Sequence, residues 1–552
     1  MKYKIVLAFT ILLFDSVLFA QNLPKSSYWV KLKDKTGTPY QISRPENFLS
    51  QRAISRRVKQ NIPIDETDLP VSPVYLDSLK KRGLEIVHAS KWLNGATVRT
   101  ADTALIRKIS TLPFVTSVQL TKPASATKSS FLKFREEEFM ADINPANYGN
   151  AINQLTQLKG DYLHNKGFRG KGIQIAILDA GFWHVNQIAA FDSLRKSNRI
   201  LGTRDFVDPS SDIYQQHTHG MSVLSCIGGN QPLSLIGTAP DAAFYLFRTE
   251  DSASEYPIEE DNWVVAAELA DSVGADVINS SLGYTVFDDP KMSHKDSELN
   301  GKTTRITQGA NMAFRKGILV FNSAGNEGKS TWKRVNAPAD GENVIAVAAV
   351  DKNGIRASFS SVGPAYGGAV KPNVAAMGSL TFLVGSTGVL DYLNGTSFSS
   401  PVLAGMGACL LQANPNASVK QIKLAIEQSG SIFNKPDSLL GYGIPDFEKA
   451  DKYLKLNTNN NLYPKSLITV SPNPFSDFIS IKNIDTISGD YYLITIYNLQ
   501  GICLLQSYFN YSETIILDNL SYLPNGFLIL SIRSGGKDQR FKMIKTSNYS
   551  KK

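Results

Sequence analysis

Four short runs of apolar, largely β-branched residues constrain the fold of this chain more than any other feature. They are Ile173–Leu178, Ala275–Asn279, Ile318–Asn322 and Val344–Val350. Runs that are apolar at nearly every position are typical of strands buried on both faces of a parallel sheet. Helical segments at Glu259–Val273 and Thr304–Lys316 lie between them. The alternation predicts an α/β domain with a parallel sheet and right-handed crossovers.

Two regions with other patterns flank this central domain. Between Tyr28 and Gln119, strands and helices alternate in a way that predicts a compact α+β unit over residues 21–124. A polar stretch at 125–145 separates this unit from the central domain at 146–455. An Asn-rich linker at 456–466 then precedes short alternating strands, which predict a small all-β module over 467–552.

The first twenty residues resemble a cleavable secretory signal. Lys2 and Lys4 precede an apolar run from Ile5 to Phe14, which Asp15 interrupts before it resumes up to Ala20. A membrane-spanning helix needs about 20 apolar residues in a row, so this stretch is too short for one. We therefore expect export and cleavage after Ala20.

The net charge of +9 is local. Residues 21–122 carry 17 Lys and Arg against 8 Asp and Glu, whereas the remainder of the chain is close to neutral. No basic patch interleaved with aromatic residues stands out in that remainder, so we expect no nucleic-acid partner. Three cysteines, an odd number, cannot form a full disulfide framework, and Cys226 and Cys409 are expected as buried thiols.

Three polar residues stand where ligands meet an open parallel sheet, at strand ends or at the starts of the following helices. Asp179 ends the first apolar run, His219 precedes a helix of small apolar residues, and Ser397 opens a helix that is apolar on every face. Pro401 is expected in the first turn of that helix. Taken singly, Asp179 and Ser397 are explained as helix caps, and His217 with His219 as a metal pair that lacks further ligands.

Taken together, the three residues fit the chemistry of an activated serine. A serine hydroxyl becomes a good nucleophile when an imidazole accepts its proton, and a carboxylate fixes the tautomer of that imidazole. The order Asp179, His219, Ser397, with a Gly-Thr-Ser block ahead of Pro401, resembles the subtilase family of serine peptidases. The resemblance implies a subtilisin-like α/β catalytic domain in which Ser397 is the nucleophile, His219 the general base and Asp179 its orienting partner.

Two further blocks extend the resemblance to the binding of the substrate. Asn326, in an Ala-Gly-Asn block, is the implied side-chain donor of the oxyanion hole, beside the backbone N–H of Ser397. A segment after the second apolar run resembles the family's substrate-binding strand, which pairs with an extended peptide. The implied substrate-binding residues are Ser281, Leu282, Gly283, Ala324 and Gly325. The resemblance thus implies an endopeptidase that acts on proteins or peptides.

The sequence also departs from the family pattern. Ala180 stands where a hydroxyl residue usually follows the catalytic Asp, and Phe398-Ser399 replace Met-Ala after the nucleophile. The segment 229–234 corresponds to a calcium-binding loop of many subtilases, but it carries no carboxylate and contains Pro232. We therefore expect no cofactor, and calcium is an alternative that the sequence does not support.

The same resemblance implies functions for the two flanking modules. The unit at 21–124 resembles subtilase propeptides, so we expect it to assist folding and to inhibit the enzyme within its own chain, although a permanent accessory domain is an alternative. The C-terminal module resembles the sorting domain of type IX secretion in Bacteroidota through Pro472-Asn473-Pro474-Phe475 and a later Leu-x-x-Gly turn. This implies delivery through the periplasm to outer-membrane secretion machinery, and a carbohydrate-binding β-module is the alternative.

Two other functions remain open at this point. One is a catalytically silent surface or adhesive protein built on the same scaffold, which the retention of Asp179, His219, Asn326 and Ser397 disfavours. The other is a sedolisin-like acid peptidase with a Glu base, which the His219-Gly220 block disfavours. The two kinds of peptidase differ in whether activity depends on a group that titrates near about pH 6.5.

Overall fold

The computed structural model describes residues 24–126, 133, 148–459, 469–482, 491–510, 514–534 and 537–547. The expected signal at 1–20 and most of the two expected linkers lie outside these residues. The chain divides into two compact units, residues 1–454 and 455–552, which are described separately. Among the described helices, none combines the length and apolar character that a membrane span requires.

A fully parallel seven-stranded sheet forms the centre of the first unit, with strand order β13-β12-β11-β10-β5-β9-β6. Its strands are β5 (Gln174–Asp179), β6 (Ile200–Asp205), β9 (Ala243–Arg248), β10 (Val277–Ser280), β11 (Leu319–Ser323), β12 (Ile345–Val350) and β13 (Val374–Met377). The four apolar runs form β5, β10, β11 and β12, which lie side by side and are almost fully buried. The predicted parallel α/β architecture is confirmed.

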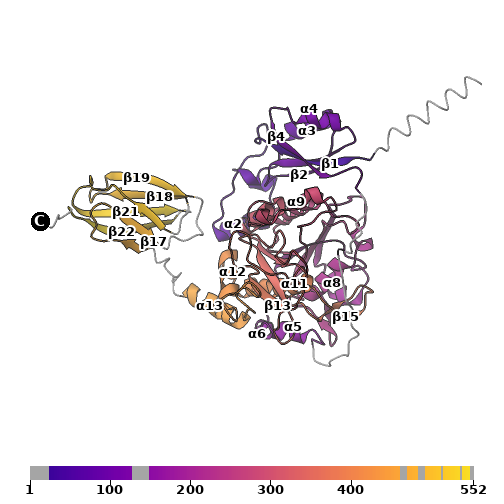
Figure 1. Ribbon diagram of the computed structural model, residues 1–552. Coiled ribbons are helices and arrows are strands. Elements are labelled where there is room, and N and C mark those ends of the chain that lie inside the picture. The colour runs from indigo at the N-terminus through magenta and orange to yellow at the C-terminus, as the bar shows by residue number, and fades with distance from the viewer. Residues whose placement is uncertain are drawn as a thin grey trace, which may run out of the picture. The chain divides into compact units, whose positions relative to one another are not determined.

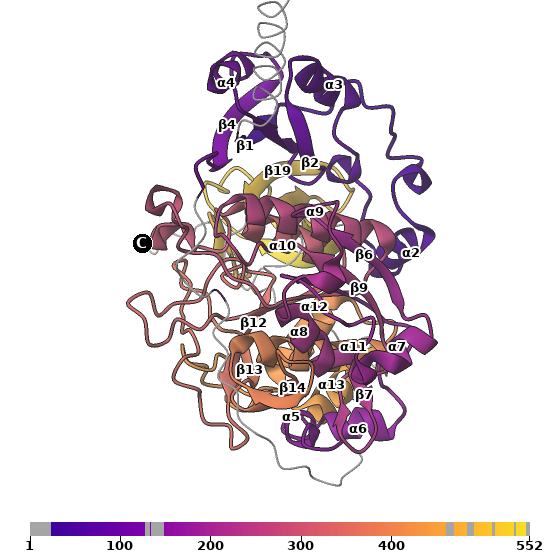
Figure 2. The same ribbon diagram turned by 90° about the vertical axis from the view of Figure 1, so that its right-hand side faces the viewer.

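Helices cover both faces of this sheet (Figures 1 and 2). α9 (Ile258–Val273) and α10 (Arg305–Arg315) pack together against one face, and α8 (His219–Gly228) and α11 (Thr396–Ala413) against the other. Smaller elements complete the unit: α5 (Ile152–Thr156), α6 (Gly160–Asn165), α7 (Asp192–Lys196), β7 (Asn230–Gln231), β8 (Leu235–Ile236), β14 (Thr381–Val384), β15 (Leu390–Leu393), α12 (Val419–Gln428) and α13 (Phe447–Asn459).

The α+β unit predicted near the N-terminus is an antiparallel sheet with strand order β2-β3-β1-β4. Its elements are β1 (Ser26–Leu32), α2 (Gln51–Gln60), α3 (Pro73–Lys81), β2 (Glu85–Ser90), β3 (Gly95–Thr100), α4 (Thr103–Ile109) and β4 (Val115–Lys122). The sheet lies over α9, and α2 reaches the C-terminal end of the same helix (Figure 1). The apolar side chains between the sheet, α3 and α4 form a core of their own.

One helix start in this unit was predicted wrongly from the sequence. The sequence pattern over Glu46–Gln60 predicts a single helix, but Pro45–Asn47 form a separate 3₁₀ turn and α2 begins at Gln51. Ser50 is the N-cap, and its hydroxyl accepts a hydrogen bond from the N–H of Ala53 at 3.2 Å. The cap residue, rather than the apolar pattern, therefore decides where this helix starts.

The second unit is an all-β module with two sheets, as the sequence predicts. One sheet has the order β16-β17-β20 and the other β19-β18-β21-β22. Their strands are β16 (Thr469–Ser471), β17 (Ile479–Lys482), β18 (Tyr491–Tyr497), β19 (Cys503–Asn510), β20 (Thr514–Leu517), β21 (Gly526–Ser534) and β22 (Lys537–Lys545). A single apolar core draws on both sheets and includes Phe475 from the Pro-Asn-Pro-Phe segment.

Candidate active site

The structure brings Asp179 and His219 together at the carboxyl edge of the sheet. Asp179 is the last residue of β5 and His219 the first of α8, and His219 Nδ1 lies 2.7 Å from Asp179 Oδ1. Both side chains are almost fully buried. A Cβ at Gly220 would lie 2.3 Å from the carbonyl of Gly181, so only glycine lets the start of α8 approach β5 this closely.

The carboxylate of Asp179 is held by a second donor. Its Oδ1 also accepts a hydrogen bond from the N–H of Ala180 at 2.8 Å. Its other oxygen, Oδ2, is buried and accepts no hydrogen bond from the described residues.

Ser397 is the second residue of α11, and a proline shapes its surroundings. Pro401 lies well inside the helix and not in the first turn as predicted, because α11 already begins at Thr396. A proline has no N–H, so the carbonyl of Ser397, four residues earlier, lacks its usual helical donor. The hydroxyl of Ser281 donates to that carbonyl instead, at 2.8 Å, while Ser397 Oγ donates to the carbonyl of Ser281 at 3.4 Å. The proline thereby ties the predicted nucleophile to the predicted substrate-binding segment.

Ser397 also lies near the dyad through its neighbour in the helix. The ring of Phe398 packs at 6.0 Å from the imidazole of His219, measured between ring centroids. Phe398, which replaces a methionine of the family pattern, is itself almost completely buried. This aromatic contact brings the start of α11 next to the start of α8.

Asn326 follows β11 and is fixed by the residue before the predicted nucleophile. Its Oδ1 accepts hydrogen bonds from the backbone N–H and the hydroxyl of Thr396, both at 2.9 Å. The side chain is exposed, and its Nδ2 donates to none of the described residues. An amide whose oxygen is held in this way presents its N–H₂ group to an incoming ligand, as an oxyanion donor must. The family pattern alone indicated no role for Thr396, although this residue stands in the Gly-Thr-Ser block.

The predicted substrate-binding residues fall into two groups. Leu282 accepts a hydrogen bond on its carbonyl from Asn322 Nδ2 at 2.9 Å, and Gly283 beyond it is exposed. The side chain of Ala324 is fully buried in a small apolar cluster, and the N–H of Gly325 donates to Thr396 Oγ1 at 3.2 Å. The segment after β10 is thus adjacent to Ser397, whereas Ala324 contributes its backbone and not an exposed side chain.

His217, the second histidine of the pair, is not a partner in a metal cluster among the described residues. Its Nδ1 accepts a hydrogen bond from the backbone N–H of His219 at 3.2 Å. Burial and the neighbouring His219 lower the pKa of His217 to about 4, so it is neutral at physiological pH. The choice of His219 over His217 as the base agrees with the position of Asp179.

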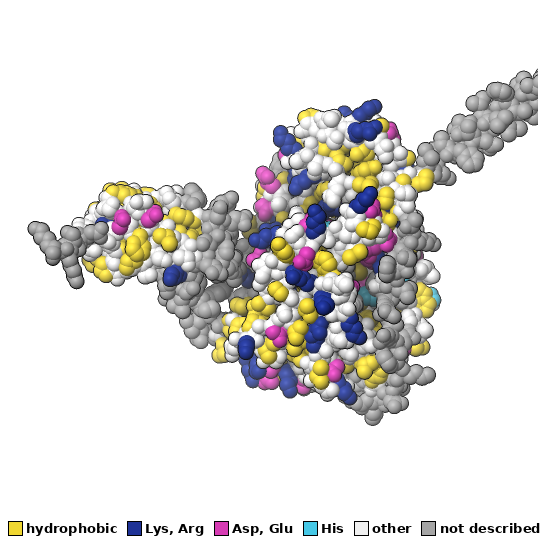
Figure 3. All heavy atoms as spheres, viewed as in Figure 1, with side chains coloured by type: hydrophobic (Ala, Val, Ile, Leu, Met, Phe, Trp, Pro, Cys, Tyr) yellow, Lys and Arg dark blue, Asp and Glu magenta, His cyan; other side chains and the backbone are white. Residues whose placement is uncertain are grey.

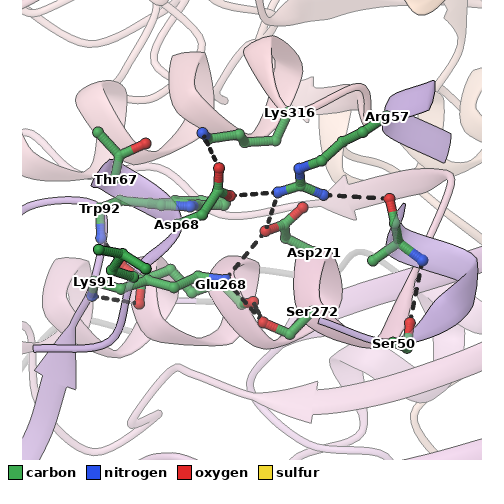
Figure 4. Close-up of polar contacts among 12 residues, drawn as sticks. Ser50, Arg57, Thr67, Asp68, Lys91, Trp92, Glu268, Asp271, Ser272 and Lys316 are labelled. Carbon is green, nitrogen blue, oxygen red and sulfur yellow. Dashed lines mark hydrogen bonds and ion pairs between the residues drawn. The ribbon is translucent and has the colours of Figure 1, made fainter. Parts of the chain in front are cut away.

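The N-terminal unit contacts the central domain mainly through charged groups, as Figure 4 shows around Arg57 and Asp271. Asp271, on α9, is fully buried and lies 2.5 Å from an Arg56 nitrogen, 2.9 Å from Arg57 and 3.2 Å from Lys91. Burial alone would raise the pKa of Asp271, but the charges of Lys91, Arg56 and Arg57 outweigh it and hold this pKa below its ordinary value.

Other contacts extend this interface along α9. Glu268 accepts hydrogen bonds from the hydroxyl of Ser90 and from the backbone N–H groups of Lys91 and Trp92, at 2.5–3.0 Å. Five cations of residues 21–122 pair with carboxylates of the central domain: Arg52, Arg56, Arg57, Lys91 and Lys122. On the face seen in Figure 3, Lys and Arg side chains are scattered among acidic and apolar ones and do not gather into a patch.

Three family profiles match the chain in consecutive segments. The Subtilase family matches residues 170–443, a Peptidase S8 propeptide domain of Bacteroidota matches residues 27–135, and a secretion system C-terminal sorting domain matches residues 469–546. Together these matches follow the three folded parts of the structure. The sorting-domain match favours secretion or display at the cell surface over a carbohydrate-binding module.

Curated relatives match the central part of the chain. A subtilisin of Bacillus pumilus is 30% identical over 281 residues, which cover 50% of this chain and 90% of the relative. A thermostable alkaline protease of Halalkalibacterium halodurans is 28% identical over 379 residues, 68% of this chain and 92% of the relative. Subtilisin NAT of Bacillus subtilis subsp. natto is 29% identical, and the matched region covers 65% of its length.

Proposed function

Because this chain belongs to the subtilase family, we propose that it is a secreted serine endopeptidase, made as an inactive precursor, that hydrolyses peptide bonds in proteins. The observation that carries the proposal is the pair formed by Asp179 and His219 at 2.7 Å, next to the start of α11, which holds Ser397. The proposed catalytic residues are Asp179, His219 and Ser397, with Asn326 in the oxyanion hole.

In the proposed reaction, the buried Asp179 fixes the proton on His219 Nδ1, so that Nε2 is free of a proton and acts as the base. A rotation about the Cα–Cβ bond of Ser397 turns its hydroxyl from the carbonyl of Ser281 toward the imidazole. Oγ then attacks the carbonyl carbon of the substrate while its proton passes to Nε2. The resulting imidazolium is stabilised by the carboxylate of Asp179.

The oxygen of the tetrahedral intermediate becomes negatively charged, and two donors face this charge in our proposal. One is the amide of Asn326, whose oxygen is held by Thr396, and the other is the backbone N–H of Ser397. His219 next gives its proton to the leaving amine, and the acyl group stays on Oγ. A water molecule, activated by the same histidine, then releases the acid and restores Ser397. This sequence uses no cofactor.

We further propose that the N-terminal unit inhibits the enzyme until it is removed, and that the C-terminal module directs the chain to outer-membrane secretion machinery. The propeptide match and the buried charge contacts along α9 support the first point. The sorting-domain match supports the second. The natural substrates are proteins or peptides, because the segment 281–283 beside Ser397 offers backbone groups to an extended chain.

The test is active-site labelling of the processed protein with a fluorophosphonate, followed by peptide mass analysis. We expect one adduct, on Ser397, that is absent from Ser397→Ala, and a loss of turnover of about 10⁶-fold in that variant, as for the corresponding change in subtilisin. Folded, processed protein that takes no label contradicts the proposal and favours the silent-scaffold alternative. A pH–rate profile that depends on a carboxyl group, and not on a group that titrates near about pH 6.5, favours an acid peptidase.

A further inference from the structure

A second cluster of titratable groups lies beyond the catalytic residues and joins Lys133 to three glutamates. Lys133 Nζ lies 2.5 Å from Glu250 Oε1, 2.8 Å from Glu255 Oε2 and 2.8 Å from Glu259 Oε1. It also donates to the backbone carbonyls of Asp251 at 2.9 Å and Ser254 at 2.6 Å. We call the three carboxylates and two carbonyls the oxygen cage.

The cage belongs to the central domain, whereas its occupant comes from the N-terminal part of the chain. The profile of the propeptide domain ends at residue 135, so Lys133 lies within the last three matched residues. The side chains of Glu250 and Glu259 are almost fully buried and that of Glu255 is 16% exposed. Removal of the propeptide would leave three carboxylates in close proximity with no cation between them.

Such a cluster has a strong physical need for a positive partner. Burying carboxylates together without a counter-charge is costly, and a compact ammonium with three donors is well matched to converging oxygens. Within the cage, burial opposes the charge of Lys133, but Glu250, Glu259 and Glu255 raise the pKa of its ammonium well above the ordinary value. Burial and the neighbouring Glu250 raise the pKa of Glu255 to about 8 even with Lys133 in place.

The cage adjoins the segment expected to bind substrate. Ser281 exchanges two hydrogen bonds with Ser397, and Tyr284, three residues later, donates its hydroxyl to Glu250. Three residues span at most about 10 Å, so a peptide extended along this segment reaches the cage with a side chain three or four residues before the bond attacked by Ser397.

We propose that the oxygen cage is a specificity site for a lysine side chain of the substrate, three or four residues before the scissile bond, and that Lys133 occupies it as the enzyme's own first substrate. This inference rests on the proposed endopeptidase function. It also gives the position of the maturation cut. Counting from Lys133, the cut follows Arg135 or Glu136.

The first test uses the processed wild-type enzyme and quenched fluorescent peptides with the sequence of residues 129–140. One peptide retains Lys133, and in two others norleucine or Glu replaces it. We expect kcat/KM to fall at least 10-fold with norleucine, which keeps the length but not the charge, and further with Glu. Equal rates for lysine and norleucine would overturn the lysine site.

Variants of the cage show whether its carboxylates cause the preference. In Glu255→Gln and Glu250→Gln, the ratio of kcat/KM for the lysine peptide to that for the norleucine peptide should fall below about 3. Glu342 is an exposed glutamate elsewhere, and Glu342→Gln should show the same ratio as the wild type. Glu255→Gln disturbs the fold least, because among the described residues the Glu255 carboxylate contacts Lys133 alone, whereas Glu250 also accepts from the hydroxyl of Tyr284. Glu259 accepts from the N–H groups of Asp251 and Tyr256 and is left unchanged. Glu255→Lys should cleave the Glu peptide faster than the wild type does. An unchanged preference in these variants would contradict the cage as its source.

Three controls separate this inference from its alternatives. Fluorophosphonate labelling of Ser397 without any lysine preference overturns the inference alone, whereas loss of labelling overturns the proposed function itself. The peptide series is run in EDTA and in CaCl₂. The processed enzyme could lack a lysine preference and instead be stabilised against heat by CaCl₂ in a way that depends on Glu255. This result would assign the cage to a divalent cation and overturn the lysine site. N-terminal sequencing of the processed protein should begin at Glu136 or Glu137, and a start elsewhere contradicts the proposed register.

Discussion

Two buried ionic clusters join the propeptide to the central domain, and they are built in opposite senses. Around Asp271, one carboxylate of α9 is surrounded by three cations of the propeptide. In the oxygen cage, one cation of the propeptide is surrounded by three carboxylates of the central domain. Removing the propeptide leaves one carboxyl group without its cations at the first place and three carboxyl groups without theirs at the second. The first cluster therefore holds the propeptide, and the second remains able to bind another cation.

The largest effect is expected from Asp271→Asn, which removes the centre of the first cluster. Arg56, Arg57 and Lys91 would then remain buried without their shared partner, and breaking a buried ion pair typically costs about 3–5 kcal/mol. In a Ser397→Ala precursor, which cannot process itself, hydrogen exchange of α9 and β2 should become about 10²–10⁴-fold faster. Glu342→Gln serves as the control, and an unchanged exchange rate would contradict a holding role for Asp271.

A smaller effect is expected from Lys133→Met, which empties the cage of its charge but keeps most of the side chain. Glu255 is partly exposed, so the carboxylates can relax or take up protons. We expect self-processing to slow by about 10–30-fold, with little change in hydrogen exchange at α9. Processing at the wild-type rate would remove the distinction between the two clusters.

The pH should affect the interface through His88, which lies at neither cluster. Its Nε2 contacts the carbonyl of Phe206 at 3.0 Å and Asn262 Oδ1 at 2.9 Å, and burial lowers its pKa to about 4, helped by Arg204 and Arg99. When the interface is open, His88 binds a proton near pH 6.5, whereas in the closed interface it does so only near pH 4. The contribution of neutral His88 to the stability of the interface is therefore complete above pH 6.5. It is lost as the pH falls through this window, by about 10-fold per pH unit.

The measurement is the opening free energy of β2 in the Ser397→Ala precursor, from hydrogen exchange corrected for the intrinsic effect of pH. Values at pH 7.0 and pH 5.5 should differ in the precursor, and the difference should shrink in His88→Gln, which cannot gain this proton. Equal pH slopes in the two proteins would exclude His88 as the source.

The smallest effect is expected at the ion pair between Lys122 and Asp251, whose atoms lie 3.2 Å apart at the edge of the cage. Both side chains are partly exposed, and such pairs contribute about 0–1 kcal/mol. Lys122→Met should therefore slow processing by no more than about 5-fold, and 0.5 M NaCl should abolish the difference. A larger effect would show that the number of ion pairs, and not their burial, determines how much these contacts contribute to processing.

Sequence patterns predicted the fold more fully than the site. Runs such as Ile175–Leu178 are buried in any parallel sheet, so their apolar character alone identifies them as strands. The exposed edge strand β6 (Ile200–Asp205) was not predicted, because it mixes Gly, Thr and Arg with apolar residues. In the site, family blocks indicated Asp179, His219 and Ser397, but the roles of Thr396 and of the Ser281 hydroxyl depend on contacts across the sheet.

The oxygen cage was beyond the reach of sequence patterns for a related reason. Glu250, Glu255 and Glu259 are spaced as any acidic loop and helix start are spaced, and helices favour acidic residues in their first turn. Their common partner, Lys133, lies more than a hundred residues earlier in a stretch without periodicity. Only the three-dimensional structure shows that one ammonium contacts all three.

The basic propeptide also has a consequence for the long-range field of the molecule. If the cut follows Arg135, the remaining residues 136–552 contain 36 Lys and Arg and 40 Asp and Glu, so the net charge changes from positive to negative on maturation. Precursor and product should then bind to ion-exchange resins of opposite sign. The field attracts the freed propeptide back over a distance of about 10 Å at 0.1 M salt, and ions screen this attraction progressively at higher salt. The cleaved propeptide should therefore dissociate from the enzyme faster as the ionic strength rises.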